Sequence, residues 1–76
     1  MSQILFPVMT EDAEAKGVVV TWFFEDGEQV EVGDLVAEIA MDKVDREIKA
    51  EHSGVLRVLV PEEEAVMQGA VIGRIE

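Results

Sequence analysis

An internal repeat is the sequence feature that most limits the folds open to this chain. Seven residues recur at a shift of 36 or 37 positions. The shift of 37 matches Gly17-Val18 with Gly54-Val55 and Glu25 with Glu62, and the shift of 36 matches Glu28 with Glu64, Val30 with Val66, Gly33 with Gly69 and Ile39 with Ile75. We interpret the change of shift as one extra residue in a turn. Neither half can bury its own apolar face, so the halves are expected to pack together with approximate two-fold symmetry.

Short segments rich in β-branched and aromatic residues alternate with turn residues along the chain. The predicted strands are residues 4–8, 18–24, 35–41, 44–50, 55–60 and 70–75. The turns between them contain Glu25-Asp26-Gly27, Val32-Gly33-Asp34, Ser53-Gly54, Pro61-Glu62 and Gln68-Gly69. Many short strands with regular turns are typical of an all-β sandwich or barrel. A chain of 76 residues leaves room for one domain, residues 1–76.

The charge balance argues against two classes of partner. Seventeen acidic and six basic residues give a formal net charge of −11, which repels phosphate backbones and anionic lipid headgroups. Neither nucleic acid nor a membrane surface is therefore an expected partner. No apolar run approaches the length of a membrane span, and residues 1–10 do not have the pattern of a secretion signal. The chain has no cysteine, which suits a reducing compartment, so a soluble cytoplasmic module is expected, bacterial or archaeal, or of the mitochondrial matrix if a transit peptide was removed.

The chain contains few residues that could catalyse a reaction. It has one histidine, His52, two serines, Ser2 and Ser53, and no tyrosine or cysteine. These residues do not form a nucleophile and base supported by a third group. A metal site is not expected, because His52 has no second histidine at ligand spacing. The acidic stretches at residues 10–16 and 62–64 are interpreted as solvated loops.

Residues 38–50 are predicted to form a β-hairpin around Met41-Asp42-Lys43-Val44. At the repeat shifts, residues 41–53 have no counterpart in the second copy, so we look for function here. If the turn centres on Asp42-Lys43, the Asp42 carboxylate can accept backbone hydrogen bonds and Lys43 projects from the tip. Arg46 has an inward parity and is expected to pack its stem at an edge. Strand alternation predicts that Val44, Ile48 and Ala50 point inward and that Asp45, Glu47 and Lys49 point to solvent.

Lys43 can be interpreted in two ways from its spacing alone. An exposed lysine amine is mostly protonated and a poor nucleophile, and Asp42 and Asp45 would help to keep it charged. Lys43 is therefore a better candidate for modification by another enzyme than for catalysis. An amide bond at its amine would remove the charge and place a flexible arm on a rigid body. A solubilising lysine at a turn is nevertheless the simpler interpretation of the spacing.

The pattern of the whole chain changes this interpretation. The chain resembles the lipoyl domains of dihydrolipoyl acyltransferase (E2) components of 2-oxo acid dehydrogenase complexes, within the biotinyl/lipoyl attachment superfamily. The resemblance covers nearly the whole chain and favours modification of Lys43. The residues that carry it, in matching order and spacing, are Gly17, Trp22, Glu25-Asp26-Gly27, Gly33-Asp34, Asp42-Lys43-Val44, Gly54-Val55 and Gly69.

The resemblance implies a flattened barrel of two four-stranded antiparallel sheets with pseudo-two-fold symmetry. It implies that Lys43 carries lipoate in amide linkage, attached by a lipoate ligase or lipoyl transferase. The lipoyl group would act as a swinging arm that passes acyl groups and electrons between the 2-oxo acid decarboxylase (E1), the acyltransferase core and dihydrolipoyl dehydrogenase (E3). The domain itself would catalyse nothing. It would be part of an acyltransferase chain or a free-standing carrier.

The chain departs from the family pattern on both sides of the expected lysine site. Many relatives have glutamate and then threonine where this chain has Ala40 and Met41. The turn residues Met41, Asp42 and Val44 are therefore candidates for recognition by the ligase or the decarboxylase. The loop at residues 9–16, which the resemblance places near Lys43, lacks the common patterns and is about one residue longer. Its candidate partner-recognition residues are Thr10, Glu11, Asp12 and Glu14.

Three other assignments compete with a lipoyl domain. A biotin carrier domain normally has methionine on both sides of its lysine, whereas Asp42 and Val44 flank Lys43 and Met41 is displaced by one position. An unmodified module of a membrane-fusion adaptor usually has long helices inserted into this hairpin and often lacks the lysine. A glycine-cleavage carrier is normally longer. Lipoate is favoured, with biotin as the alternative cofactor.

The aromatic residues Trp22, Phe23 and Phe24 follow one another in a predicted strand. Alternation puts Trp22 and Phe24 on one face and Phe23 on the other, and at least two of the three are expected in the core.

Overall fold

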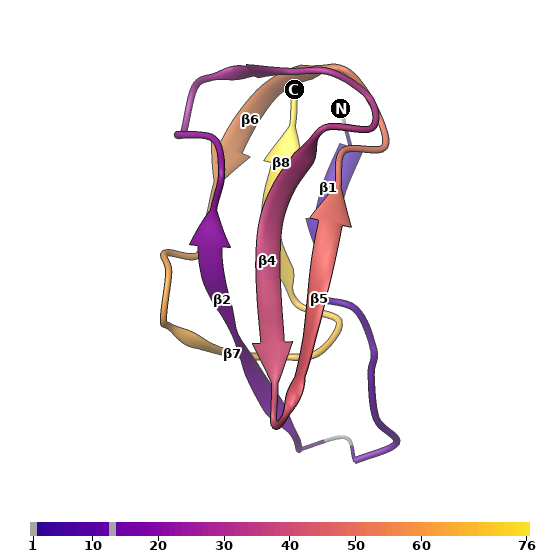
Figure 1. The fold of residues 1–76 in the computed structure, drawn as a ribbon. Helices are drawn as coiled ribbons and strands as arrows, with labels where there is room; N and C mark the ends of the chain where they lie inside the picture. The colour runs from indigo at the N-terminus through magenta and orange to yellow at the C-terminus, as the bar shows by residue number, and fades with distance from the viewer. Residues whose placement is uncertain (1, 13) are drawn as a thin grey trace.

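The computed structural model describes residues 2–12 and 14–76, and all regular elements in these residues are β-strands (Figure 1). The strands are β1 (Ser2–Leu5), β2 (Lys16–Trp22), β3 (Gln29–Val30), β4 (Leu35–Met41), β5 (Val44–Lys49), β6 (Gly54–Val58), β7 (Ala65–Met67) and β8 (Val71–Ile75). They form two four-stranded sheets with the orders β1-β8-β6-β3 and β5-β4-β2-β7. All pairings are antiparallel. The predicted fold class is confirmed.

Two strands escaped the sequence analysis because they are very short. β3 has two residues and β7 has three, too few to show the alternation that identifies a strand. Each contains a repeat valine, Val30 or Val66, and the Val30 side chain is fully buried. The other six strands overlap the predicted segments, and β4 has the predicted bounds. The bounds of the remaining five strands differ from the predicted bounds by one to three residues at one or both ends.

The two-fold repeat is complete, and the expectation that residues 41–53 have no counterpart is wrong. The two strand orders match when each strand number is changed by four: β1, β8, β6 and β3 of one sheet correspond to β5, β4, β2 and β7 of the other. The counterpart of β5 is therefore β1. The registers agree, since Ile48 faces Ala37 as Ile4 faces Gly73. The counterpart of the β4–β5 hairpin is thus the β8–β1 pair, in which the two chain ends lie side by side (Figure 1). The sequence comparison missed the correspondence of β1 with β5 because the equivalent residues Ile4 and Ile48 are 44 positions apart, whereas the other matches occur at shifts of 36 or 37.

The extra residue that changes the repeat shift lies in a strand and not in a turn. The pairing of β2 with β4 shifts between Val19 and Thr21, as in a β-bulge. The structural counterpart of Glu62 is consequently Asp26 and not Glu25. The Asp26 carboxylate accepts a hydrogen bond from the Val58 amide at 2.9 Å, and the Glu62 carboxylate accepts one from the Trp22 amide at 2.8 Å.

One apolar core fills the space between the sheets. No buried polar or charged residue is present in the described part of the chain. Trp22 and Phe24 pack against the core, whereas Phe23 is 49% exposed, which confirms the predicted alternation. The indole N–H of Trp22 donates to the carbonyl oxygen of Val60 at 2.9 Å, so its polar atom is satisfied. The largest fully buried side chains are Phe6, Ile39, Leu56, Ile72, Val19, Val30 and Val36.

Gly17 is required for space. A Cβ atom at this position would overlap the Phe6 ring and lie 2.7 Å from the carbonyl oxygen of Ala40. We expect Gly17→Ala to lower the free energy of unfolding by about 1 to 3 kcal/mol through overpacking. Urea denaturation measures the loss. Gly33→Ala is the comparison, since Gly33 has open space but a φ of 91°, and strain there should cost about 1 kcal/mol. A Gly17→Ala variant as stable as the wild type would contradict the close contact.

An exposed ion-pair cluster lies at the C-terminal end of β8. The Glu76 carboxylate contacts the guanidinium of Arg57 at 3.0 Å and that of Arg74 at 2.8 Å. Asp26 lies 3.8 Å from Arg57. The hydrogen bond from Arg57, followed by the one from Arg74, holds the pKa of Glu76 below its ordinary value near 4.5. The same hydrogen bond and charge raise the pKa of Arg57.

The lowered pKa of Glu76 predicts a small pH dependence of stability. The folded state holds this proton more weakly than the unfolded state, so the stabilisation is present above the ordinary pKa near 4.5. It is lost as the pH falls through the lower folded-state pKa. We expect Glu76→Gln to flatten the curve of unfolding free energy against pH in this acid range, by a small amount because the pairs are exposed. Urea denaturation at a series of pH values tests this. Glu64→Gln is the control, and superimposable curves for Glu76→Gln and wild type would refute the prediction.

Candidate functional site

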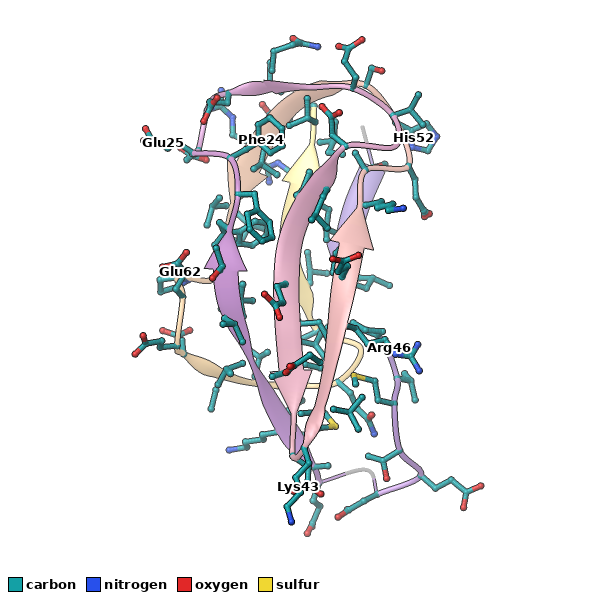
Figure 2. All side chains as sticks on the ribbon, in the orientation of Figure 1. Phe24, Glu25, Lys43, Arg46, His52 and Glu62 are labelled. Atoms are coloured by element: carbon teal, nitrogen blue, oxygen red, sulfur yellow. The ribbon has the colours of Figure 1, made fainter. Side chains whose placement is uncertain are left out.

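Lys43 lies at the tip of the β4–β5 hairpin. Met41 pairs with Val44, so Asp42 and Lys43 alone form the turn, as predicted. The hairpin ladder continues for six paired positions from the turn, which gives the tip a stiff support. Lys43 is exposed, and its side chain projects away from the body of the molecule (Figure 2). The amine is therefore presented at one place and is accessible to another protein.

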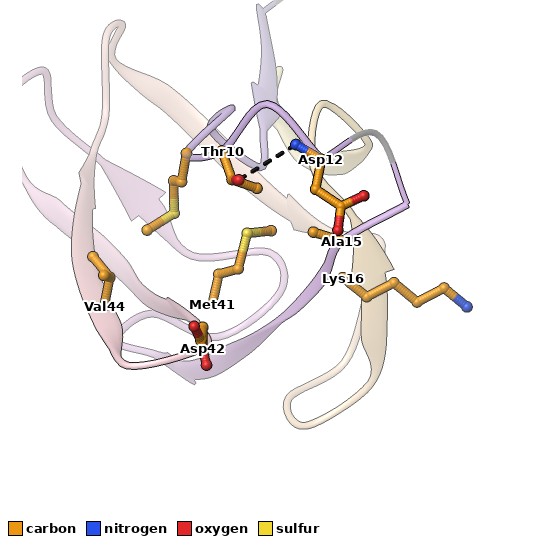
Figure 3. Close-up of a pocket in the computed structure, with 8 residues that line it drawn as sticks. Thr10, Asp12, Ala15, Lys16, Met41, Asp42 and Val44 are labelled. Carbon is orange, nitrogen blue, oxygen red and sulfur yellow. Dashed lines mark hydrogen bonds between the residues drawn. The ribbon is translucent and has the colours of Figure 1, made fainter.

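Asp42 supports the turn through its backbone conformation. Its φ is 56°, in the left-handed region that aspartate and asparagine adopt more readily than most residues. The expected backbone hydrogen bonds to the Asp42 carboxylate do not occur among the described residues. The carboxylate instead faces the groove described below (Figure 3).

The prediction that Val44, Ile48 and Ala50 point inward is correct only for the end of the segment that is distant from the hairpin tip. Ala50 is 4% exposed and Ile48 is half-buried, but Val44 is 50% exposed, so its inward assignment is wrong. Arg46, assigned an inward parity, is exposed as well. The reason is that β5 is an edge strand whose first residues form the tip, where alternation no longer separates core from solvent. The predicted outward residues Asp45, Glu47 and Lys49 are exposed.

A groove of about 520 Å³ separates the hairpin from the connection between β1 and β2, which we call the β1–β2 loop (residues 6–15). The loop and the hairpin thus lie beside each other next to Lys43, as expected (Figures 1 and 3). Met41 is buried next to the hairpin turn, and Met9 is half-buried on the loop side. The groove is lined by Met9, Thr10, Asp12, Ala15, Lys16, Met41, Asp42 and Val44.

The structure brings together most of the residues singled out from the sequence. All three turn candidates, Met41, Asp42 and Val44, line the groove. Two of the four loop candidates, Thr10 and Asp12, line it from the other side, and the Asp12 amide donates to the Thr10 hydroxyl at 3.3 Å. Glu11 and Glu14 are exposed outside the lining set. Sequence reasoning missed the groove residues Met9, Ala15 and Lys16. These residues flank the candidate loop residues in the sequence, and that adjacency was a signal that could have identified them.

The chemistry available at this site is that of an accessible primary amine. None of the ion pairs in the described residues involves Lys43. In the same residues no cluster of three metal-ligating side chains occurs, and no helix could span a membrane. Formation of an amide at the Lys43 amine requires an acyl group that has already been activated, because a free carboxylate does not condense with an amine in water. A lysine at the apex of a stiff β body has the geometry that a carrier domain needs for a covalently attached group.

Comparison with known proteins identifies the family. The model of a family described as Biotin-requiring enzyme matches residues 2–75. The chain belongs to this biotin/lipoyl attachment family. A solved structure of the lipoyl domain of the 2-oxoglutarate dehydrogenase complex from Azotobacter vinelandii superimposes with a TM-score of 0.83 and 32% identity. The alignment covers 100% of this chain and 96% of that domain.

Curated relatives agree with the lipoyl branch of the family. The succinyltransferase component of the 2-oxoglutarate dehydrogenase complex from Bacillus subtilis is 37% identical over 99% of this chain. The acetyltransferase component of the pyruvate dehydrogenase complex from Zymomonas mobilis is 37% identical over 90% of this chain. The chain spans only 18% and 15% of these two proteins. It is a lipoyl domain, which is a carrier domain, and domains of this kind hold lipoate covalently on a lysine.

The left-handed conformation of Asp42 predicts which substitutions the turn tolerates. Asp42→Gly and Asp42→Asn should retain the stability of the wild type, because both residues adopt positive φ readily. Asp42→Val should lower the free energy of unfolding by about 1 to 2 kcal/mol. Urea denaturation of the variants measures this. Asp45→Val is the matched control, because a β-branched residue suits that exposed strand position. Equal stability of Asp42→Val and Asp42→Asn would show that the turn is not constrained as described.

Proposed function

We propose that Lys43 carries lipoate in amide linkage. The single observation that carries this proposal is the exposed Lys43 amine at the apex of a two-residue turn held by the β4–β5 ladder. The family likeness supports the choice of group, because the solved relative is named as a lipoyl domain. The flanking residues Asp42 and Val44 support lipoate over biotin. A lipoate ligase or lipoyl transferase would attach the group, reading Met41, Asp42 and Val44 around the lysine.

We infer that the modified domain serves a 2-oxo acid dehydrogenase complex. Its partners would be the decarboxylase, the acyltransferase core and dihydrolipoyl dehydrogenase, in the cytoplasm of a bacterium. Held on Lys43, lipoate would supply a disulfide that can be reduced and acylated together, with the acyl group and the electron pair both coming from the decarboxylated 2-oxo acid. The names of the bacterial relatives, which are components of such complexes, support this inference.

The residues of this chain contribute presentation. The β4–β5 ladder and the conformation of Asp42 hold the Lys43 backbone at one place, so the flexible part of the arm begins at the lysine side chain. Tethering raises the effective concentration of the attached group at each centre, provided that the arm and any linker reach it. A stiff attachment point also limits the conformations that must be ordered when a partner engages the tip.

The loop side of the groove is proposed to identify the decarboxylase. Thr10, Glu11, Asp12 and Glu14 are exposed beside the hairpin, and three of them are acidic. A basic surface on the decarboxylase would complement them and would speed the encounter. The ligase and the decarboxylase would thus read different parts of the site, the ligase the hairpin turn and the decarboxylase the loop as well.

The proposal predicts that Lys43→Arg abolishes modification without unfolding the domain. Arginine keeps the charge but cannot form the amide, and an exposed turn substitution should change stability by less than about 0.5 kcal/mol. Intact-mass spectrometry after incubation with lipoate and a bacterial lipoate ligase gives the readout. Lys49→Arg is the matched control, because Lys49 is exposed on the same hairpin but lies away from the tip.

The wild type and Lys49→Arg should gain the mass of one lipoyl group, and Lys43→Arg should gain none. Lipoylation of Lys43→Arg would contradict the assignment of the site. Retention on streptavidin of protein from its native host would identify biotin instead of lipoate.

A further inference from the structure

The side chain of Gln68 binds the β1–β2 loop through four hydrogen bonds. Its Oε1 accepts from the Met9 amide at 2.9 Å and from the Thr10 amide at 3.2 Å. Its Nε2 donates to the carbonyl oxygens of Thr10 at 2.8 Å and of Asp12 at 3.0 Å. Both ends of the amide are therefore engaged, and the partners are 56 to 59 residues away in the sequence.

The turn that carries Gln68 is itself fixed. The Ala70 amide donates to the Met67 carbonyl at 3.1 Å, and Gly69 has a φ of 84°, as the third residue of a type II turn requires. The turn is also attached to the first residue of the loop, Phe6. The Gly69 amide donates to the Phe6 carbonyl at 2.7 Å, and the Phe6 amide donates to the Ala70 carbonyl at 2.9 Å. Because Phe6 is fully buried, Gln68 projects from a part of the molecule that the core holds in place.

Among the described residues of the loop after Val8, Met9 and Ala15 also pack against the core, but no other side chain joins this part of the loop to the rest of the chain by a hydrogen bond. The remaining hydrogen bonds of residues 9–12, 14 and 15 are local: the amides of Asp12, Glu14 and Ala15 donate to Thr10 and Asp12. Gln68 thus supplies every hydrogen bond that joins this part of the loop to the rest of the described chain. Without it, the loop would sample more conformations, and a partner would have to order them on binding.

The two-fold repeat shows that this contact is not a requirement of the fold. The counterpart of Gln68 at the repeat shift is Val32, which is 64% exposed and has no side-chain group that could hydrogen-bond. The connection that corresponds to the β1–β2 loop, residues 50–53, has four residues in place of ten. Gln68 therefore occurs together with the longer loop, on the side of the groove next to Lys43.

We propose that Gln68 is a positioning residue for recognition by the decarboxylase. It holds the loop wall of the groove in the conformation that the decarboxylase reads, without touching the reacting atoms. This inference rests on the proposed function of Lys43 and of the loop. It predicts that substitution of Gln68 separates two reactions that use the same lysine. Lipoylation depends on the hairpin turn, which the β4–β5 ladder holds independently of Gln68, whereas acylation by the decarboxylase depends on the loop.

The test compares Gln68→Ala and Gln68→Glu with the wild type. Alanine removes all four hydrogen bonds. Glutamate keeps the acceptor for the Met9 and Thr10 amides but turns an oxygen toward two carbonyl oxygens, so it should also fail. Gln29→Ala is the matched control, because the Gln29 side chain bonds only to the adjacent residues Val30 and Glu31.

Each variant is first lipoylated with a bacterial lipoate ligase and then offered to two decarboxylases as probes. These are the decarboxylase of the Bacillus subtilis 2-oxoglutarate dehydrogenase complex with 2-oxoglutarate, and that of the Zymomonas mobilis pyruvate dehydrogenase complex with pyruvate. With the probe that acylates the wild type, both Gln68 variants should lose about tenfold in kcat/KM, mainly through a higher KM. Their lipoylation rates and those of Gln29→Ala should match the wild type. Amide hydrogen exchange by NMR should accelerate at Met9 and Thr10 and remain unchanged in β4 and β5.

Each other result counts against a defined claim. Wild-type acylation kinetics in Gln68→Ala would overturn the positioning role, as would a parallel loss of lipoylation and thermal stability, which would indicate a general structural role. A wild type that is not lipoylated, or that neither decarboxylase acylates, would overturn the proposed function itself. The two failures are distinguishable. A failure of the positioning role is seen only when the wild type is lipoylated and acylated, whereas a failure of the proposed function is seen in the wild type itself.

Discussion

The contact between the apolar faces of the two sheets is the interaction on which the rest of this domain depends. Each sheet has four short strands and could not be stable alone in water. Phe6 and Ile39, from opposite sheets or their extensions, are both fully buried in the shared core. Close packing at this core explains why Gly17 cannot carry a side chain beneath the Phe6 ring. The stiffness of the whole body, and hence of the hairpin that extends from it, follows from this contact.

The region around Lys43 combines two kinds of support. The hairpin turn is held by the ladder pairing of β4 with β5 and by the left-handed conformation of Asp42, and the Gln68 side chain makes no hydrogen bond to it. The β1–β2 loop on the other side of the groove is held from a distance, by the Gln68 side chain. A carrier domain has to be recognised by several proteins in turn. In the proposed function, the partners share the rigid turn and the decarboxylase also reads the loop, and these two kinds of support would permit this.

Parts of this arrangement could be predicted from the sequence, and they are the local ones. The strand β4 and the turn at Asp42-Lys43 were found because alternation and turn residues act over a few positions. The strands β3 and β7 were missed because two or three residues carry no period. Val44 was placed inward because alternation cannot tell where a hairpin leaves the core. The groove beside the hairpin was expected only as a proximity of the loop to Lys43, and its methionine lining was not.

The sequence by itself determined that the chain is an all-β repeat with a lysine displayed at a hairpin tip. These properties follow from patterns between near neighbours and from the shifts of 36 and 37 positions between the halves. Only the tertiary structure decided that β1 is the counterpart of β5, that the extra residue lies in the β2 bulge, and that Gln68 holds the loop. Those features are contacts between residues far apart in the chain. Their formation depends on how the two sheets close around one core, and no local pattern records it.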